Sequence, residues 1–145
     1  MMSFAASIAL AVSLALSGQT AAAAPQITVV TMPAAQTVEE YVRDYFADTP
    51  IMIEVARCES HFKQFDKDGS VHRGVVNDQD VGVMQVNEHY HLAVADKLGL
   101  DLYSIQGNLA YAKYLYEKEG TQPWSSSSPC WKKSSVYKKE LALSK

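Results

Sequence analysis

Cysteine is scarce in this sequence: Cys58 and Cys130 are the only two among 145 residues. They stand far apart and form no Cys-x-x-Cys pair, which excludes the dithiol motif of redox catalysts and the clustered thiolates of a structural zinc site. The four histidines have no metal-ligand spacing, and residues 66–69 lack the third oxygen ligand of an EF-hand loop. We therefore expect neither a bound metal nor a cofactor.

Positive charge is also scarce, since Lys and Arg number 13 against 16 for Asp and Glu, which gives a net charge of −3. No basic patch interleaved with aromatic residues is present, so nucleic acid is not an expected partner. Lysine gathers only after Trp131. We interpret residues 132–145 as a solvated, Lys-rich C-terminal tail, with contact between this tail and anionic polymers as the alternative.

No apolar run is long enough to cross a bilayer core of about 30 Å. The run from Phe4 to Leu16, followed by small residues and then Pro25, is instead typical of a secretory signal peptide, although no Lys or Arg precedes Arg43. We predict that residues 1–24 are removed on export. Because no cysteine follows the run, we expect a secreted protein without a stable membrane anchor.

The remaining residues, 25–145, are enough for one domain with a single core, and we expect a monomer. Residues 25–36 are rich in Ala, Pro and Thr without a periodic pattern, which predicts a linker. Two cysteines in an exported chain favour a disulfide bond between Cys58 and Cys130, and two buried reduced thiols are the alternative.

The clearest local signals predict two helices. Thr37 and Glu40 form a capping box ahead of apolar residues spaced by three and four, so a helix is expected to follow. Thr49 and Pro50 match the cap and the first position of a second helix, which we predict to end at about Ser60.

A different pattern follows the second helix. Asp68-Gly69 is a hairpin turn signal, and Val75-Val76 offers a further short strand. These signals predict a small antiparallel sheet over residues 64–80. Two more helices are predicted, over residues 91–98 and 104–119, and each is closed by a glycine.

Two short motifs carry the chemistry. Residues 57–62 read Arg-Cys-Glu-Ser-His-Phe, with Glu59 in the last turn of the second predicted helix, and residues 82–87 read Gly-Val-Met-Gln-Val-Asn. The pair resembles motifs of the lysozyme-like superfamily, in particular lytic transglycosylases, goose-type lysozymes and resuscitation-promoting factors. The resemblance covers about residues 51–131, within a domain that we place at residues 37–131.

The resemblance implies a mainly helical α+β fold of the lysozyme-like type, with a helical lobe, a small antiparallel sheet and a cleft between them. It also implies cleavage of the β-1,4 bond between N-acetylmuramic acid and N-acetylglucosamine in peptidoglycan glycan strands, in the periplasm or at the cell wall. Glu59 would be the general acid, which requires burial to raise its pKa above the usual value of about 4.3. Without the second motif, the alternative interpretation is that Glu59 is an ordinary surface glutamate.

The second motif supplies the predicted sugar contacts. In the family its Met and Gln contact the sugar, so Met84 and Gln85 are substrate-binding candidates, together with Asn87 at the end of the motif. Goose-type lysozymes have an Asp at that last position, which would position a water. Asp78 and Asp80 lie nearby and are alternatives for that role, although loop Asp residues more often cap turns.

Residues 108–115 resemble a later helix of the family, on which a tyrosine lines the cleft. Tyr111 and Tyr114 are three positions apart and share a helix face, so either is a candidate, with core packing as the alternative. Resuscitation-promoting factors tie a Cys-Glu-Ser motif to a cysteine shortly after a tryptophan. That likeness supports the pairing of Cys58 with Cys130.

The chain also departs from the family. Lytic transglycosylases usually carry Ser-x-x-Gly-Ala-x-Gly before the second motif, and here Val76, Gln79 and Asp80 replace the Ser, Gly and Ala. Asn87 in place of Asp favours a lytic transglycosylase, which needs no second carboxylate because the muramic C6 hydroxyl closes onto C1 as a 1,6-anhydro ring. The alternatives are a lysozyme that hydrolyses the same bond with water and a catalytically inactive wall-binding module.

Overall fold

Helices make up most of the part of the chain that the structure describes. The computed structural model describes residues 35–143, so the predicted signal peptide and all but the last two residues of the predicted linker lie outside it. Nine elements follow in chain order: α1 (Val38–Tyr45), α2 (Pro50–Ser60), β1 (Asp80–Val81), β2 (Val86–Asn87), α3 (Glu88–Lys97), α4 (Ile105–Glu119), the 3-10 helix η1 (Gln122–Ser127), α5 (Ser128–Trp131) and α6 (Ser135–Leu143). The predicted α+β class, mainly helical with a small antiparallel sheet, is confirmed.

Helices α1 and α2 begin where the sequence predicts. The capping box is present, since the Glu40 amide donates to the Thr37 hydroxyl at 3.2 Å and the Thr37 amide donates to the Glu40 carboxylate at 2.8 Å. Pro50 opens α2, although the Thr49 side chain makes no capping hydrogen bond. Helix α2 then stops abruptly at Ser60, because the next residue, His61, has left-handed backbone with φ 54°.

The sheet lies later in the chain than predicted. Its two strands, β1 and β2, pair in antiparallel fashion. Of the predicted range 64–80, only Asp80 belongs to a strand, and the rest contributes to the isolated bridges Phe65–Val71 and Arg73–Val81. Val75 and Val76, predicted as a strand, are fully exposed in a loop. The amide of Gly74 donates to the carbonyl of Asp80, which closes this loop and leaves the two valines without a strand partner.

The later helices agree with prediction to within one residue, except at the start of α3. Helix α3 begins at Glu88, three residues before the predicted start, because β2 ends at Asn87, which occupies the N-cap position although its side chain makes no capping hydrogen bond. Helix α4 begins at Ile105, one residue after the predicted start, because Ser104 is its N-cap and accepts from the Gly107 amide at 3.0 Å, and it ends at Glu119 as predicted. The predicted closing residues Gly99 and Gly120 both have positive φ.

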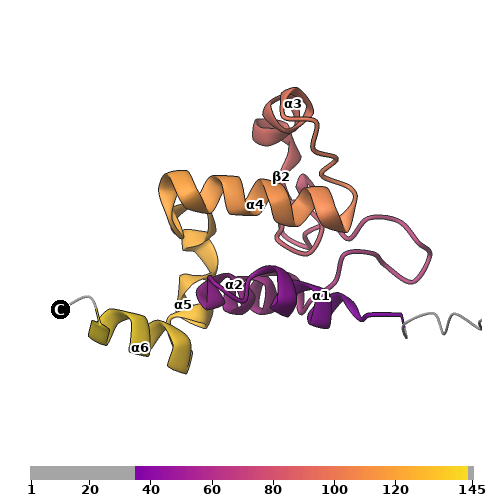
Figure 1. Cartoon of the computed structure of the whole chain (residues 1–145). Helices are drawn as coiled ribbons and strands as arrows, with labels where there is room; N and C mark the ends of the chain where they lie inside the picture. Colours follow the sequence, from indigo (N-terminus) through magenta and orange to yellow (C-terminus); the bar gives the residue numbers. More distant parts are fainter. Residues whose placement is uncertain (1–34, 144–145) are drawn as a thin grey trace, which may run out of the picture. The chain divides into compact units, whose positions relative to one another are not determined.

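The Lys-rich segment contains a helix. Helix α6 contacts α2 (Figure 1), and the ring of Tyr137 packs edge-on against Trp131 with ring centroids 5.5 Å apart. Its lysines stay in solvent: Lys138 and Lys139 are exposed.

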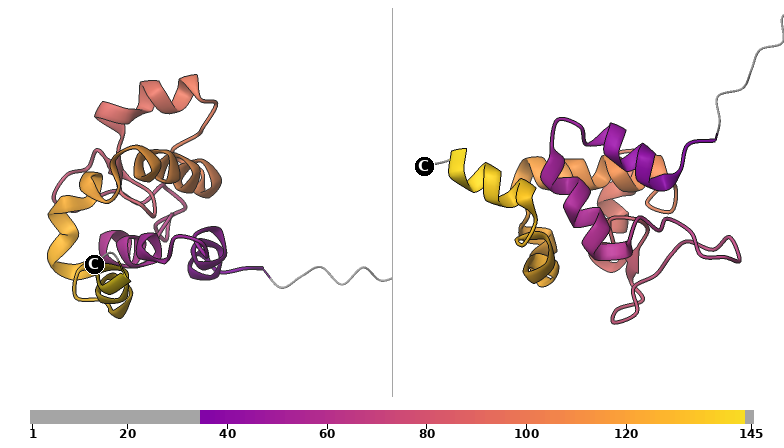
Figure 2. Two further views of the ribbon diagram at one scale, coloured as in Figure 1. Left: turned by 60° about the vertical axis from the view of Figure 1, so that its left-hand side comes forward. Right: turned by 90° about the horizontal axis from the view of Figure 1, so that it is seen from below.

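The hydrophobic core lies between α4 and the helices packed against it. Helix α4 contacts α1 and η1, and it reaches α3 through a hydrogen bond between Tyr111 and His91. Figure 2 shows α4 between α3 on one side and α1 and α2 on the other. Val42, Phe46, Met52 and Leu109 are fully buried there. Within residues 35–143, no helix is both long enough and apolar enough to cross a membrane. This packing sets the end of α2, which carries Glu59, opposite the β1–β2 hairpin.

Candidate active site

The hairpin loop formed by residues 82–85 is held by buried polar side chains from other elements. Ser60 donates to the Val83 carbonyl at 2.8 Å, and Gln64 accepts from the Val83 amide at 2.9 Å. The indole of Trp124 donates to the Met84 carbonyl at 2.8 Å. The serine of the Glu-Ser motif therefore fixes the second motif in space, which is a physical reason for the two to occur together.

Asn108 of α4 is the central member of this network and is fully buried. Its Oδ1 accepts from the Met84 amide at 2.9 Å, and its Nδ2 donates to the carbonyls of Val81 and Leu102, both at 3.0 Å. Gly82, with φ 72°, lies so close that a Cβ there would be 2.5 Å from Asn108 Nδ2. One amide side chain thus satisfies three backbone groups of the hairpin and its surroundings.

Replacing Asn108 with alanine is expected to lower the free energy of unfolding by about 3 kcal/mol, because it leaves buried backbone groups without partners. Urea unfolding of the oxidised protein measures the change. The matched control is Gln106→Ala, an exposed position on the same helix, which should change stability little. Equal stability of the two variants would contradict the role assigned to Asn108.

Glu59 is partly buried at the end of α2 and has one hydrogen-bond donor in the described chain. The Ser127 hydroxyl of η1 donates to its Oε1 at 2.6 Å. Burial raises the pKa of Glu59 above its usual value, the Ser127 hydrogen bond opposes that rise, and the negative charge of Asp80 adds to it. The balance favours a carboxyl that keeps its proton to higher pH than an exposed glutamate.

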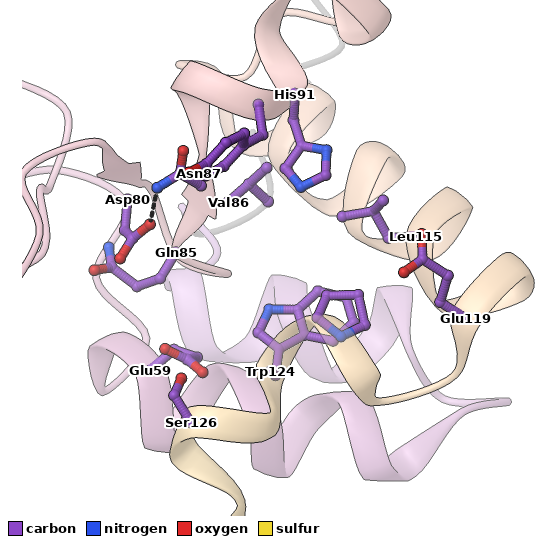
Figure 3. A pocket seen from close by; sticks show the side chains of 12 residues that line it. Glu59, Asp80, Gln85, Val86, Asn87, His91, Leu115, Glu119, Trp124 and Ser126 are labelled. Atoms are coloured by element: carbon purple, nitrogen blue, oxygen red, sulfur yellow. Dashed lines mark hydrogen bonds between the residues drawn. The ribbon is translucent and has the colours of Figure 1, made fainter.

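Two pockets meet at Glu59. Pocket A, of about 330 Å³, extends toward α3 and the end of α4 (Figure 3). Pocket B, of about 460 Å³, extends along the loop that carries Val75 and Val76. Their shared lining residues are Glu59, Asp80, Gln85 and Ser126. Glu59 therefore lies between two adjoining pockets.

Gln85 and Asn87, two of the predicted substrate-binding residues, line pocket A. Asn87 Nδ2 donates to Asp80 Oδ1 at 2.7 Å, and among residues 35–143 Asn87 Oδ1 is the one buried side-chain oxygen or nitrogen without a hydrogen-bond partner. Gln85 has φ 49°, a strained value for a residue with a side chain, and its side-chain Nε2 donates to the Gly82 carbonyl at 2.9 Å.

The other three predicted contact residues lie off the pocket walls. Met84 is fully buried, because its amide and carbonyl are both bonded inside the network that holds the loop. Tyr111 is 1% exposed, and its ring packs in a tilted arrangement against Tyr114 with ring centroids 5.5 Å apart. Its hydroxyl lies 3.1 Å from Nδ1 of His91, a residue that does line pocket A. Neither tyrosine lines pocket A or pocket B.

Asp80, considered in the sequence as a substitute carboxylate, lines both pockets, whereas Asp78 lines neither. Two further residues complete the site, and the sequence did not single them out. Ser127 donates a hydrogen bond to Glu59, and Glu119 lies at the far end of pocket A. Ser127 belongs to a run of serines without any local pattern, so the fold alone reveals its contact. Glu119 has no sequence signal beyond its place at the end of a helix.

The disulfide between Cys58 and Cys130 is confirmed, with the two Cα atoms 6.0 Å apart. It joins α2, one residue before Glu59, to α5. Because η1 runs directly into α5, the bond also holds Trp124 and Ser127 near the end of α2.

The lining of both pockets is acidic and polar. Glu59, Asp80 and Glu119 contribute carboxyl groups to pocket A, and no Lys or Arg among residues 35–143 lines either pocket. Within the described chain, no group of three or more His, Cys, Asp or Glu side chains is placed to hold a metal ion. The site can supply a protonated carboxyl, a second carboxylate and amide groups to a neutral or cationic ligand.

Comparison of the chain with protein-family models, curated proteins and solved structures gave no match, which leaves the motifs and the geometry of the site as the grounds for a function.

Proposed function

We propose that this protein is an exported enzyme that cleaves the β-1,4 bond between N-acetylmuramic acid and N-acetylglucosamine in peptidoglycan, with Glu59 as the proton donor. The observation that carries the proposal is the partly buried Glu59 carboxyl, with its raised pKa, at the junction of two pockets. Glycosidic bonds break when the leaving oxygen receives a proton, and a carboxyl with a raised pKa provides one near neutral pH.

The two pockets suit a polymer. A glycan strand cleaved internally has sugars on both sides of the broken bond, and Glu59 has a pocket on each side. The neutral and acidic lining excludes the cationic clusters that phosphorylated substrates need. The helices on one side of Glu59 and the β1–β2 hairpin on the other support a lysozyme-like arrangement for the proposed fold.

The proposed reaction is that of a lytic transglycosylase. Glu59 gives its proton to the glycosidic oxygen as the bond from C1 of N-acetylmuramic acid breaks. The resulting carboxylate then takes the proton of the C6 hydroxyl of the same sugar, whose oxygen bonds to C1. The products are a 1,6-anhydro-N-acetylmuramic acid end and a free N-acetylglucosamine 4-hydroxyl, so proton and bonds balance without water.

Asp80 favours a second candidate, a lysozyme that hydrolyses the same bond. Its carboxylate lines both pockets with Glu59 and acts on the pKa of Glu59 by charge. A second carboxylate in a glycosidase can activate a water or stabilise the oxocarbenium-like transition state. Glu59 and Asp80 are therefore compatible with either reaction, and the products distinguish transglycosylation from hydrolysis.

The disulfide bond supports the export part of the proposal. Disulfides form and persist in oxidising compartments such as the periplasm and the extracellular space. An exported protein would encounter a cell-wall substrate in these same compartments.

The pH dependence of wall digestion tests the role of Glu59. Because the reaction needs Glu59 protonated, its rate should fall as the pH rises through the raised pKa of that carboxyl. Ser127→Ala removes a hydrogen bond that lowers this pKa, so the alkaline limb should move to higher pH. Asp80→Asn removes a negative charge that raises it, so the limb should move to lower pH. The measurement is the initial rate of release of soluble fragments from purified peptidoglycan.

Opposite shifts in the two variants identify Glu59 as the titrating group. An alkaline limb that stays at the same pH in the wild type and both variants would assign the titration to another residue. Absence of fragment release by the folded wild-type protein at every pH would overturn the proposed activity itself.

A further inference from the structure

A third pocket lies against a different face of η1 from the candidate active site. Pocket C, of about 200 Å³, is bounded by η1, α5 and α6, and it shares no lining residue with pocket A or pocket B. The cleavage steps proposed above use none of its side chains. It is lined by Thr121, Gln122, Ser125, Ser128, Trp131, Lys132 and Tyr137.

The geometry of η1 explains why its residues face different pockets. In a 3-10 helix, residues three positions apart lie one above another. Gln122, Ser125 and Ser128 have this spacing and line pocket C, whereas Pro123 and Ser126, also three positions apart, line pocket A. The serine run therefore supplies hydroxyl groups to the candidate active site on one face and to pocket C on another.

Pocket C is opposite in charge to the candidate active site. Lys132 is the charged side chain in its lining, and no Asp or Glu among residues 35–143 lines it. The ammonium group of Lys132 lies 5.4 Å from the centroid of the Trp131 ring and makes no ion pair with any residue in 35–143. This cation is therefore available to an anion from outside the chain.

Neutral donors surround the cation. The hydroxyl groups of Ser125, Ser128 and Tyr137 make no hydrogen bond to another group of residues 35–143, so each can donate to a ligand. The rings of Trp131 and Tyr137 pack edge-on with centroids 5.5 Å apart and give the pocket an aromatic wall. This set of groups suits a small ligand that has one negative charge, several acceptor oxygens and attached carbon atoms.

We infer that pocket C binds a phosphodiester group of a linear anionic polymer. Lys132 faces the charged oxygens, the hydroxyl groups of Ser125 and Ser128 donate to them, and the neighbouring carbon atoms of the polymer pack on Tyr137. One ammonium group balances the single charge that a phosphodiester carries. The inference goes beyond the proposed function and does not depend on it.

The lysines outside the pocket favour a polymer over a single small anion. Lys133, in the turn after α5, and Lys138 and Lys139 of α6 are exposed. A polymer with a phosphate in each repeat places one phosphate in pocket C and others beside these lysines. A bilayer surface also carries phosphodiesters, but it is flat, whereas pocket C is recessed between three elements. A linear chain fits such a recess better.

A carboxylate is the rival ligand for Lys132. The planar carboxylate is matched best by the fork of an arginine, whereas lysine acts as a point charge that suits the tetrahedral phosphate. Every cationic side chain after Arg73 is a lysine. A phosphate monoester would bring a second charge that Lys132 alone does not balance. These comparisons favour the phosphodiester.

The test measures binding of a short glycerol phosphate oligomer to the oxidised protein by calorimetry. Lys132→Gln should weaken binding about tenfold, because it removes a charge-assisted contact, and Ser125→Ala about threefold. The matched control is Lys139→Gln, which removes the same charge from an exposed position outside the pocket and should weaken binding no more than about twofold. The oligomer should also raise the thermal midpoint of the wild type more than that of Lys132→Gln.

Equal weakening in Lys132→Gln and Lys139→Gln would overturn the inference, because the attraction would then be diffuse and would not involve a pocket. A glutamate oligomer of the same charge that binds as tightly would do so as well, since phosphate would not be the recognised group. Tighter binding to vesicles of phosphatidylglycerol than to the oligomer would make the partner a membrane and refute the polymer. Absence of binding to the oligomer would refute it outright.

The outcome is separate from that of the proposed function. Glu59→Gln should bind the oligomer as the wild type does, because Glu59 lines only the other two pockets. Oligomer binding without cleavage of peptidoglycan would refute the enzyme alone. Cleavage without oligomer binding would refute the ligand of pocket C alone.

Discussion

Replacing Glu59 with glutamine is expected to lower the rate of peptidoglycan cleavage by about a thousandfold while the protein remains folded. Glutamine keeps the size of the side chain and can still accept the hydrogen bond of Ser127, but it has no proton to give. General acid catalysis contributes roughly 10²–10⁴ in rate, and glycosidic cleavage depends on it strongly. The initial rate of fragment release measures the loss.

The matched control for this substitution is Glu54→Gln. Glu54 lies on the same helix, forms an ion pair with Arg57 at 2.9 Å and lines neither pocket. The Glu54→Gln variant should cleave at the wild-type rate, because Glu54 lies off the pockets and a partly exposed ion pair contributes little to stability. Retention of full activity by Glu59→Gln would remove Glu59 from the mechanism.

Removing the disulfide, by Cys58→Ser together with Cys130→Ser, is expected to cost about 4 kcal/mol in the free energy of unfolding, because the bond closes a loop of 72 residues. Activity should fall as well, even at temperatures where the variant stays folded. The bond holds η1, and η1 supplies the Ser127 hydroxyl to Glu59 and the Trp124 indole to the hairpin loop. Urea unfolding and cleavage assays on the same samples measure the two effects.

Reduction of the wild-type protein provides the comparison, since it opens the same bond without changing the sequence. The reduced wild type and the double variant should match each other in stability and in rate. Equal stability of oxidised and reduced protein would contradict the structural role of the bond. Full activity of a folded, reduced protein would contradict its role in placing η1 beside Glu59.

The sequence was most informative where local chemistry decides the structure. The capping box at Thr37, the Pro50 start of α2 and the end of α4 at Glu119 each depend on neighbouring residues, and each is confirmed. The disulfide followed from there being only two cysteines. The position of Glu59 in the last turn of α2 was predictable for the same reason.

Distant residues explain why the predicted strand at Val75 and Val76 is absent and why Met84 is buried. Val75 and Val76 have the composition of a strand, but the Gly74–Asp80 hydrogen bond closes their segment into a loop, and no neighbouring strand remains for them. Met84 matches a motif that in the family contacts sugar, yet here its backbone is bonded to Asn108 and Trp124 and its side chain joins the core. No local sequence pattern predicts the loop at Val75 and Val76 or the burial of Met84.

The candidate site was predictable only in part. Glu59, Gln85 and Asn87 line pocket A, and their motifs were visible in the sequence. Ser127 and Glu119 also line the pockets, but their sequence segments carry no functional motif. Only the fold of η1 and the end of α4 places them there. The sequence singled out Glu59, and the structure shows which groups surround it.

Mass spectrometry of the soluble products, after the oxidised protein has been incubated with purified peptidoglycan, tests the central claim most directly. The account predicts muropeptides that end in 1,6-anhydro-N-acetylmuramic acid, each lighter by one water than the hydrolysis product, and their absence with Glu59→Gln. Products with reducing ends would instead establish the hydrolytic candidate. Intact glycan after incubation with folded, oxidised protein would contradict the claim that Glu59 cleaves the cell wall.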